Sequence, residues 1–148
     1  MNLEAKINND LKEAMKAKDE KGLRGIRAIK NAILVHKTSG AGVEVTDADE
    51  IKILQKLVKQ RKESLTIFEQ NNRAELAQTE REEIEVIERY LPKQLGEAEI
   101  EAVVKQIIAE TGATGMKEMG KVIAAANKQL AGQAEGAVIS GVVKKLLS

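Results

Sequence analysis

Three charged side chains in the middle of the chain lie where the expected helices are apolar. At about 100° per residue, Arg61 falls inside the apolar arc of one helical stretch, and Glu80 inside that of the next. If these stretches form an antiparallel hairpin that turns near Asn71, Arg61 is level with Glu83 and within one turn of Glu80. A guanidinium with two carboxylates suits either acid–base chemistry or a structural ion pair. The pattern favours a structural ion pair that fixes the register of the helices.

A second group of candidates lies in the last 37 residues, where short apolar stretches alternate with glycines and lysines. Helix N-termini and backbone N–H groups beside glycines can bind phosphate, and such contacts suit the backbone of a folded RNA. The lysines are Lys117, Lys121, Lys128, Lys144 and Lys145. They predict a nucleic-acid surface, although lysines at this density also serve solubility.

One motif in this region imitates a nucleotide-binding loop. Gly115–Lys121 fits the pattern G-x-x-x-x-G-K, but Val122 stands where the loop needs Ser or Thr for Mg²⁺. The segment before it is also expected to be a helix that ends at Gly112, whereas a phosphate loop follows a strand. We therefore expect no nucleotide site here.

The remaining polar candidates need no function. Arg24, Arg27 and Asn31 lie opposite the apolar face of their expected helix and fit a solvated surface. His36 is near the end of the same helix, where an imidazole is favoured by the negative helix terminus.

The composition excludes several classes of protein. With no Cys and a single His, a thiolate or multi-His metal site and a Ser-His relay are not expected, so we predict no metal, cofactor or catalytic residue. Two aromatic residues cannot stack successive bases of single-stranded RNA. The longest apolar run has five residues, so we expect no membrane span and a cytoplasmic location.

Apolar periodicity predicts helices almost throughout and no strand. Four helices are expected before residue 92, and the second ends near the loop Ser39–Gly42. Thr46 or Asp47 is expected to begin the third, and the fourth is expected to run through Leu76 to Leu91. Three shorter helices follow. The predicted fold is all-α: a four-helix N-terminal body with a long helical hairpin, and a small three-helix tail.

Glycine and proline mark the boundary between these parts. The only proline is Pro92, and six of the eleven glycines fall in the last 37 residues. We predict a helical body over 1–95, a tail over 96–148 and a hinge across Pro92–Gly96. The net charge is +5 over 1–62, −5 over 63–91 and +3 over 112–148.

Several short motifs together resemble the GatB/YqeY family over nearly the whole chain. They are Ile87–Leu95 (Ile-Glu-Arg-Tyr-Leu-Pro-Lys-Gln-Leu), Lys59–Ser64 (Lys-Gln-Arg-Lys-Glu-Ser), Met119–Ile123 (Met-Gly-Lys-Val-Ile) and Gly132–Gly136 (Gly-Gln-Ala-Glu-Gly). Members are similar to the C-terminal helical and tail domains of the GatB component of the aspartyl/glutamyl-tRNA amidotransferase. The resemblance implies a helical body and a three-helix tail that contacts tRNA.

The resemblance adds Gly120, Gly132 and Gln133 to the lysines as nucleic-acid-binding candidates. Gln133 stands where the family usually has Lys, and Asn127 where an apolar residue or Pro is common. Nothing corresponds to the catalytic cradle, so the family label of a carbon–nitrogen ligase with glutamine as amide donor would belong to the larger GatB protein.

The implied function is a tRNA-binding or amidotransferase-associated module that is not an enzyme by itself. Its expected partners are tRNA and an aminoacyl-tRNA synthetase or amidotransferase components. Two alternatives stay open: a helical protein-interaction adaptor with no nucleic-acid role, and an enzyme that uses Arg61 with Glu80 and Glu83.

Overall fold

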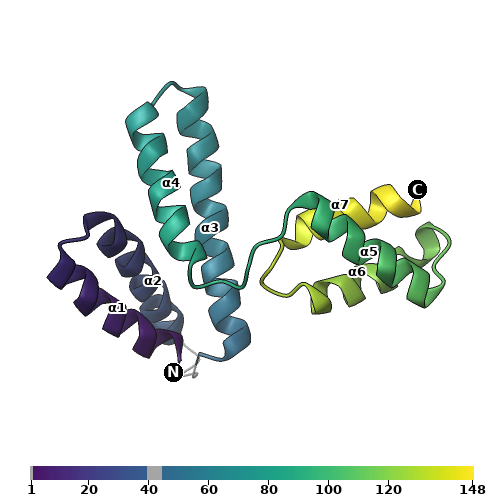
Figure 1. Ribbon diagram of the computed structural model, residues 1–148, viewed down its shortest axis with the longest axis horizontal. Coiled ribbons are helices and arrows are strands. Elements are labelled where there is room, and N and C mark those ends of the chain that lie inside the picture. Colours follow the sequence, from purple (N-terminus) through teal and green to yellow (C-terminus); the bar gives the residue numbers. More distant parts are fainter. Residues whose placement is uncertain (1, 40–44) are drawn as a thin grey trace. The chain divides into compact units, whose positions relative to one another are not determined.

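The computed structural model describes residues 2–39 and 45–148, and these residues are helical except for short connections (Figure 1). The helices are α1 (Leu3–Ala17), α2 (Glu20–Thr38), α3 (Asp47–Gln70), α4 (Ala74–Glu88), α5 (Glu97–Thr111), the 3₁₀-helix η1 (Met116–Glu118), α6 (Met119–Gln129) and α7 (Gly136–Leu147). The all-α prediction is confirmed. The loop expected at Ser39–Gly42 lies, apart from Ser39, outside the described residues.

The chain divides into two compact units, Met1–Leu91 and Pro92–Ser148. The N-terminal unit holds α1 to α4, and the C-terminal unit holds α5 to α7 with η1. Each unit has a hydrophobic core of its own. The four-helix body and three-helix tail predicted from the sequence are therefore both present.

In the N-terminal unit, α3 and α4 form the long helical hairpin, and α2 packs against both of them as well as against α1. Side-chain caps define where three of these helices begin. Asn2 and Asp19 accept hydrogen bonds from the first turns of α1 and α2, and Thr46 forms a reciprocal capping box with Asp49 at the start of α3. The core is centred on Ile7, Ile29, Leu54 and Ile87.

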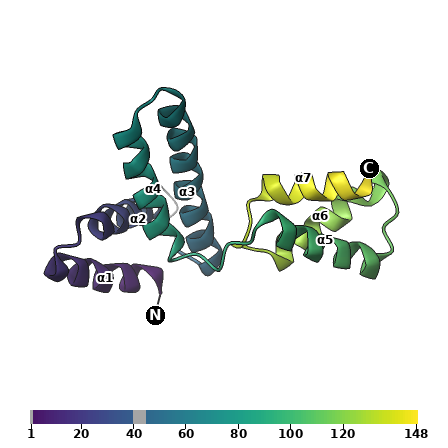
Figure 2. The same ribbon diagram turned by 45° about the horizontal axis from the view of Figure 1, so that its top comes forward.

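The tip of the hairpin differs from the sequence prediction. Leu76, expected on the apolar face of α4, is 45% exposed, because it lies in the first turn of α4, where the hairpin extends beyond α1 and α2 (Figures 1 and 2). The fourth helix also ends at Glu88 and not at Leu91, since the chain turns before Pro92. The turn expected near Asn71 is present, with Asn72 in the left-handed region at φ 56°.

The C-terminal unit buries one face of each of its α-helices. Val104 of α5, Val122 of α6 and Val143 of α7 are fully buried at its centre. Gly112 ends α5 with φ +70°, the left-handed cap for which glycine is best suited.

We predict that the close contact between α2 and α4 depends on Gly25. A Cβ atom on Gly25 would lie 2.5 Å from Cγ1 of Val86, and both residues are buried. Gly25→Ala should therefore lower the free energy of unfolding by about 1–3 kcal/mol through overpacking. Lys30→Ala, at an exposed position of the same helix, should stay within about 0.5 kcal/mol of the wild type. Urea unfolding followed by Tyr90 fluorescence reports on this unit, and equal midpoints for the two variants would refute the prediction.

Candidate functional site

The charged cluster predicted on the hairpin is assembled by α3 and α4. Arg61 Nε donates to Glu83 Oε2 across 3.2 Å, and Arg61 Nη1 donates to the Leu57 carbonyl across 3.3 Å. The Arg61 and Glu83 side chains are only 19% and 18% exposed. The hairpin thus places Arg61 level with Glu83, as its turn near Asn71 requires.

Glu80 lies beside this pair in a less favourable environment. Its Oε2 atom is buried and has no hydrogen-bond partner in the part of the chain that the structure describes. Burial raises the pKa of Glu80, the negative charge of Glu83 raises it further, and Arg61 opposes both effects. Glu80 is therefore protonated more readily in the folded protein than an ordinary glutamate is.

A carboxyl with a raised pKa beside a second carboxyl group is an arrangement that acid–base enzymes use. Substrate access is the second requirement, and here the three side chains belong to two helices packed against each other. None of them lines the groove between α2 and α3. The cluster therefore fits the structural ion pair better than an active site.

The basic face of α2 is partly engaged in ion pairs within the body. Arg24 Nη2 lies 3.5 Å and Lys21 Nζ 3.4 Å from the same carboxylate oxygen of Glu82 on α4. Arg27 and Asn31 are exposed, as a solvated face requires.

The candidate lysines of the C-terminal unit are all exposed, and they divide between its two ends. Lys117 belongs to η1 and Lys121 to the first turn of α6, whereas Lys144 and Lys145 belong to the last turn of α7. The end of α7 lies beside the connection between α5 and α6 (Figures 1 and 2), so the backbone segments that carry these four lysines lie at one end of the unit. We call them the four-lysine end. Lys145 Nζ lies 4.0 Å from Glu101 Oε2.

Lys128 lies in the last turn of α6, towards the opposite end of the C-terminal unit. Gly120 is exposed near the start of α6, and a Cβ atom there would meet nothing within 4 Å. The structure therefore brings Gly120 near the four-lysine end and leaves Lys128 apart from it.

Gly132 and Gln133 hold the segment that leads into α5. The Gly132 carbonyl accepts a hydrogen bond from Gln94 Nε2 (2.7 Å), and the Gln133 carbonyl accepts one from the Leu95 N–H (2.9 Å). Gln133 Nε2 also donates to the Lys93 carbonyl (3.3 Å). Gly132 is buried and has φ +78°, a conformation that suits glycine. These bonds give both residues a structural task at the end of the unit that holds Lys128.

The motif Gly115–Lys121 is not a nucleotide-binding loop. It contains η1 and the start of α6, and the helix α5 precedes it where a phosphate loop requires a strand. Among the described residues, no group of three or more His, Cys, Asp or Glu side chains is placed to hold a metal ion. No described helix is both long and apolar enough to cross a membrane.

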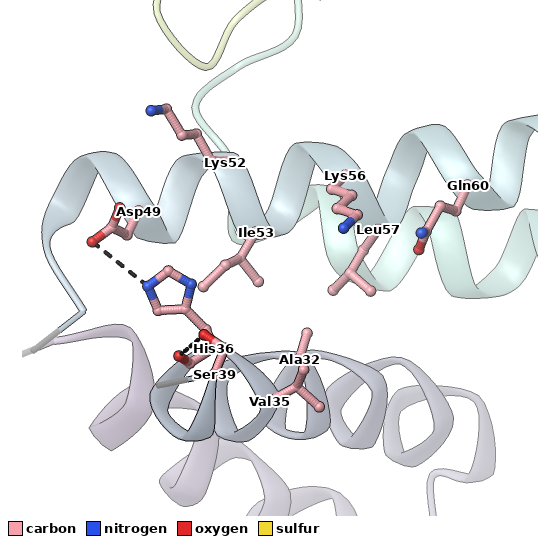
Figure 3. A pocket seen from close by; sticks show the side chains of 10 residues that line it. All are labelled: Ala32, Val35, His36, Ser39, Asp49, Lys52, Ile53, Lys56, Leu57 and Gln60. Carbon is pink, nitrogen blue, oxygen red and sulfur yellow. Dashed lines mark hydrogen bonds and ion pairs between the residues drawn. The ribbon is translucent and has the colours of Figure 1, made fainter. Parts of the chain in front are cut away.

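The sequence analysis missed a groove on the N-terminal unit, between the second half of α2 and the first half of α3 (Figure 3). It has a volume of about 440 Å³. It is lined by Ala32, Val35, His36, Ser39, Asp49, Lys52, Ile53, Lys56, Leu57 and Gln60. The available signals were the spacing of Lys52 and Lys56 by one helical turn and the apolar Val35 beside His36.

One end of this groove is closed by His36 and Asp49. His36 Nε2 lies 3.8 Å from Asp49 Oδ2 (Figure 3). The Thr46 N–H donates to the same carboxylate oxygen across 3.1 Å, and this bond is the main cause that holds the pKa of Asp49 below its ordinary value. Asp49 thus caps α3 and borders the groove with one side chain.

A family described as Yqey-like protein matches residues 4–147 of this sequence. The chain belongs to this family. Its curated relatives include proteins named altered inheritance of mitochondria protein 41, mitochondrial. The one from Lachancea thermotolerans is 35% identical over 108 residues, which are 72% of this chain and 58% of the relative. The one from Pyrenophora tritici-repentis is 29% identical over 140 residues, 93% of this chain and 69% of the relative. The Yqey-like chain thus spans less than two thirds of the first relative.

We expect Glu80→Gln to stabilise this Yqey-like protein at neutral pH. Since the folded-state pKa of Glu80 is raised above the ordinary 4.5, ionisation of Glu80 costs stability as the pH rises through the folded-state pKa. Below pH 4.5 the carboxyl is protonated in both states and this cost is absent. The gain from Glu80→Gln should therefore be present at about pH 7 and vanish near pH 4, as measured by urea unfolding at each pH.

Glu83→Gln is the matched control, because it removes the carboxylate that pairs with Arg61. It should lower the free energy of unfolding at neutral pH, the opposite sign from Glu80→Gln. Destabilisation by both substitutions at neutral pH would contradict the assignment of Glu80 as the less favourable carboxylate.

Proposed function

We propose that this Yqey-like chain is a tRNA-binding module whose C-terminal unit contacts the phosphate backbone. The observation that carries the proposal is the four-lysine end, where the start of α6 meets the end of α7. Lysines present point charges that bind phosphates without reading bases, which suits a folded RNA. The resemblance to the tail of the GatB component of the amidotransferase supports tRNA as the RNA concerned.

The small number of lysines at the four-lysine end limits its affinity for RNA. Four lysines neutralise few phosphates, and Glu101 beside Lys145 offsets part of their charge. Binding should therefore be modest and lose strength quickly as salt rises. Lys128, at the other end of the unit, adds charge but no shared surface.

In this proposal the chain assists tRNA chemistry and does not carry it out. The Arg61 cluster has a structural role, and the catalytic cradle of the GatB component has no counterpart in the sequence. The partners we propose are tRNA and the aminoacyl-tRNA synthetase or amidotransferase components that act on it. We place the chain in the cytoplasm, whereas the names of its relatives place those proteins in mitochondria.

A second role, protein binding, is favoured by the groove between α2 and α3, whose floor is apolar. This role belongs to the N-terminal unit, and it is compatible with RNA binding by the C-terminal unit.

We expect folded tRNA to bind the full chain with a log–log salt slope of about −3, as four phosphate contacts imply. The variant Lys117→Gln/Lys121→Gln/Lys144→Gln/Lys145→Gln should lose most of this affinity and most of the slope. The matched control replaces four exposed lysines of the N-terminal unit by Gln: Lys12, Lys16, Lys30 and Lys59. Titrations at several salt concentrations measure both quantities. An equal loss in the two variants would assign the binding to net charge and refute the proposed surface.

A further inference from the structure

The groove between α2 and α3 has an apolar floor that the described residues of the N-terminal unit leave open. Ile53 and Leu57 of α3 point towards α2, and Ala32 and Val35 of α2 lie opposite them (Figure 3). Val35 is 58% exposed, as is its neighbour Leu34. Such exposure of large apolar side chains beside a groove marks a surface that a partner covers.

The α3 side of the groove carries two lysines, Lys52 and Lys56. Residues 51–62 of α3 contain five Lys and Arg and no Asp or Glu, and of these Arg61 is paired with Glu83 of α4. Lys56 and Gln60 lie beside Leu57 on α3, and the Lys52 side chain, one turn before Lys56, points away from α2 (Figure 3). Asp49 supplies the single acidic group of the lining, and it is already engaged with Thr46 and His36.

We propose that this groove docks an acidic amphipathic helix of a protein partner. The apolar face of that helix would cover Val35, Ile53 and Leu57, and carboxylates along its edge would lie beside Lys52 and Lys56. From Asp49 to Gln60 the groove follows α3 for about 16 Å, which matches a partner helix of about three turns. The proposal goes beyond tRNA binding and concerns the other unit.

The apolar floor distinguishes this surface from an RNA site. Phosphates gain nothing from Ile53 or Leu57, and His36 is the one ring in the described lining on which a base could stack, without Phe, Tyr or Trp beside it. An amphipathic helix uses both parts of the surface, because its apolar residues bury the floor while its carboxylates meet the lysines.

A pair of synthetic helical peptides tests the proposal on the full chain. Each has twelve residues with blocked ends and leucines on one face, and the two differ only in glutamate or lysine along the edges of that face. In ¹⁵N-labelled protein, the acidic peptide should shift the amide signals of residues 32–39 and 49–60 and bind at least about tenfold more tightly than the basic peptide.

Two variants with the same change of charge locate the binding. Lys52→Glu/Lys56→Glu should weaken the acidic peptide by about tenfold or more, whereas Lys12→Glu/Lys16→Glu, on exposed positions of α1, should leave it within about twofold. Val35→Asp places a negative charge on the apolar floor. This charge repels the glutamates of the acidic peptide, so the variant should also bind that peptide more weakly. Since Val35 is largely exposed, this variant should keep the circular dichroism of the wild type.

Three outcomes would overturn the proposal. The first is equal binding of the two peptides, or no binding of the acidic peptide at millimolar concentration. The second is an equal loss in both double variants. The third is displacement of the acidic peptide by tRNA with shifts at the same amides, which would make the groove an RNA surface. The peptide titrations do not depend on the four lysines of the C-terminal unit. Failure of the RNA proposal can therefore be distinguished from failure of the groove proposal.

Discussion

The close contact between α2 and α4 at Gly25 holds the first half of α2 against the core of the N-terminal unit. With no side chain at Gly25, the first half of α2 comes within van der Waals reach of Val86. The second half of α2 then faces α3 across the groove that His36 and Lys56 border. The absence of a Cβ atom at Gly25 thus allows α2 to pack closely against α4. The first half of α2 contributes to the core, and the second half lines one side of the groove.

The uneven charge of the sequence follows the same division. The acidic stretch on α4 faces the start of α2, where Glu82 lies near both Lys21 and Arg24, and it faces α3, where Glu83 pairs with Arg61. These contacts neutralise basic residues on the α4 side of the body. The lysines of α3 that border the groove lie away from this acidic stretch, so that side of the unit keeps a positive charge. Net charge near zero for the whole chain therefore conceals a neutralised side and a positive side of the N-terminal unit.

The sequence predicted the helices, the start of α3 at Thr46 or Asp47 and the level of Arg61 with Glu83, because each depends on periodicity or on a short turn. It did not predict the exposure of Leu76, since periodicity tells which face of a helix is apolar and not how far the neighbouring helices extend. The structural role of Gly132 and Gln133 could not be predicted from the sequence either. Their partners, Gln94 and Leu95, are about 40 residues distant in sequence, and the glycine that resembles a phosphate-binding position instead supplies a carbonyl for a turn. The groove was missed for the same reason: its lining comes from two helices, α2 and α3, which approach each other only in the folded chain.

Both proposed surfaces contain lysines, but only the groove has apolar side chains between them. The two surfaces should therefore differ in how their binding depends on salt. At the four-lysine end, binding energy comes from counterion release, which salt opposes directly. In the groove, part of the binding energy comes from covering Val35, Ile53 and Leu57, and apolar burial does not weaken as salt rises. Salt at physiological strength therefore weakens RNA binding more than peptide binding. If both proposals hold, an acidic protein partner stays bound at salt concentrations that release the RNA.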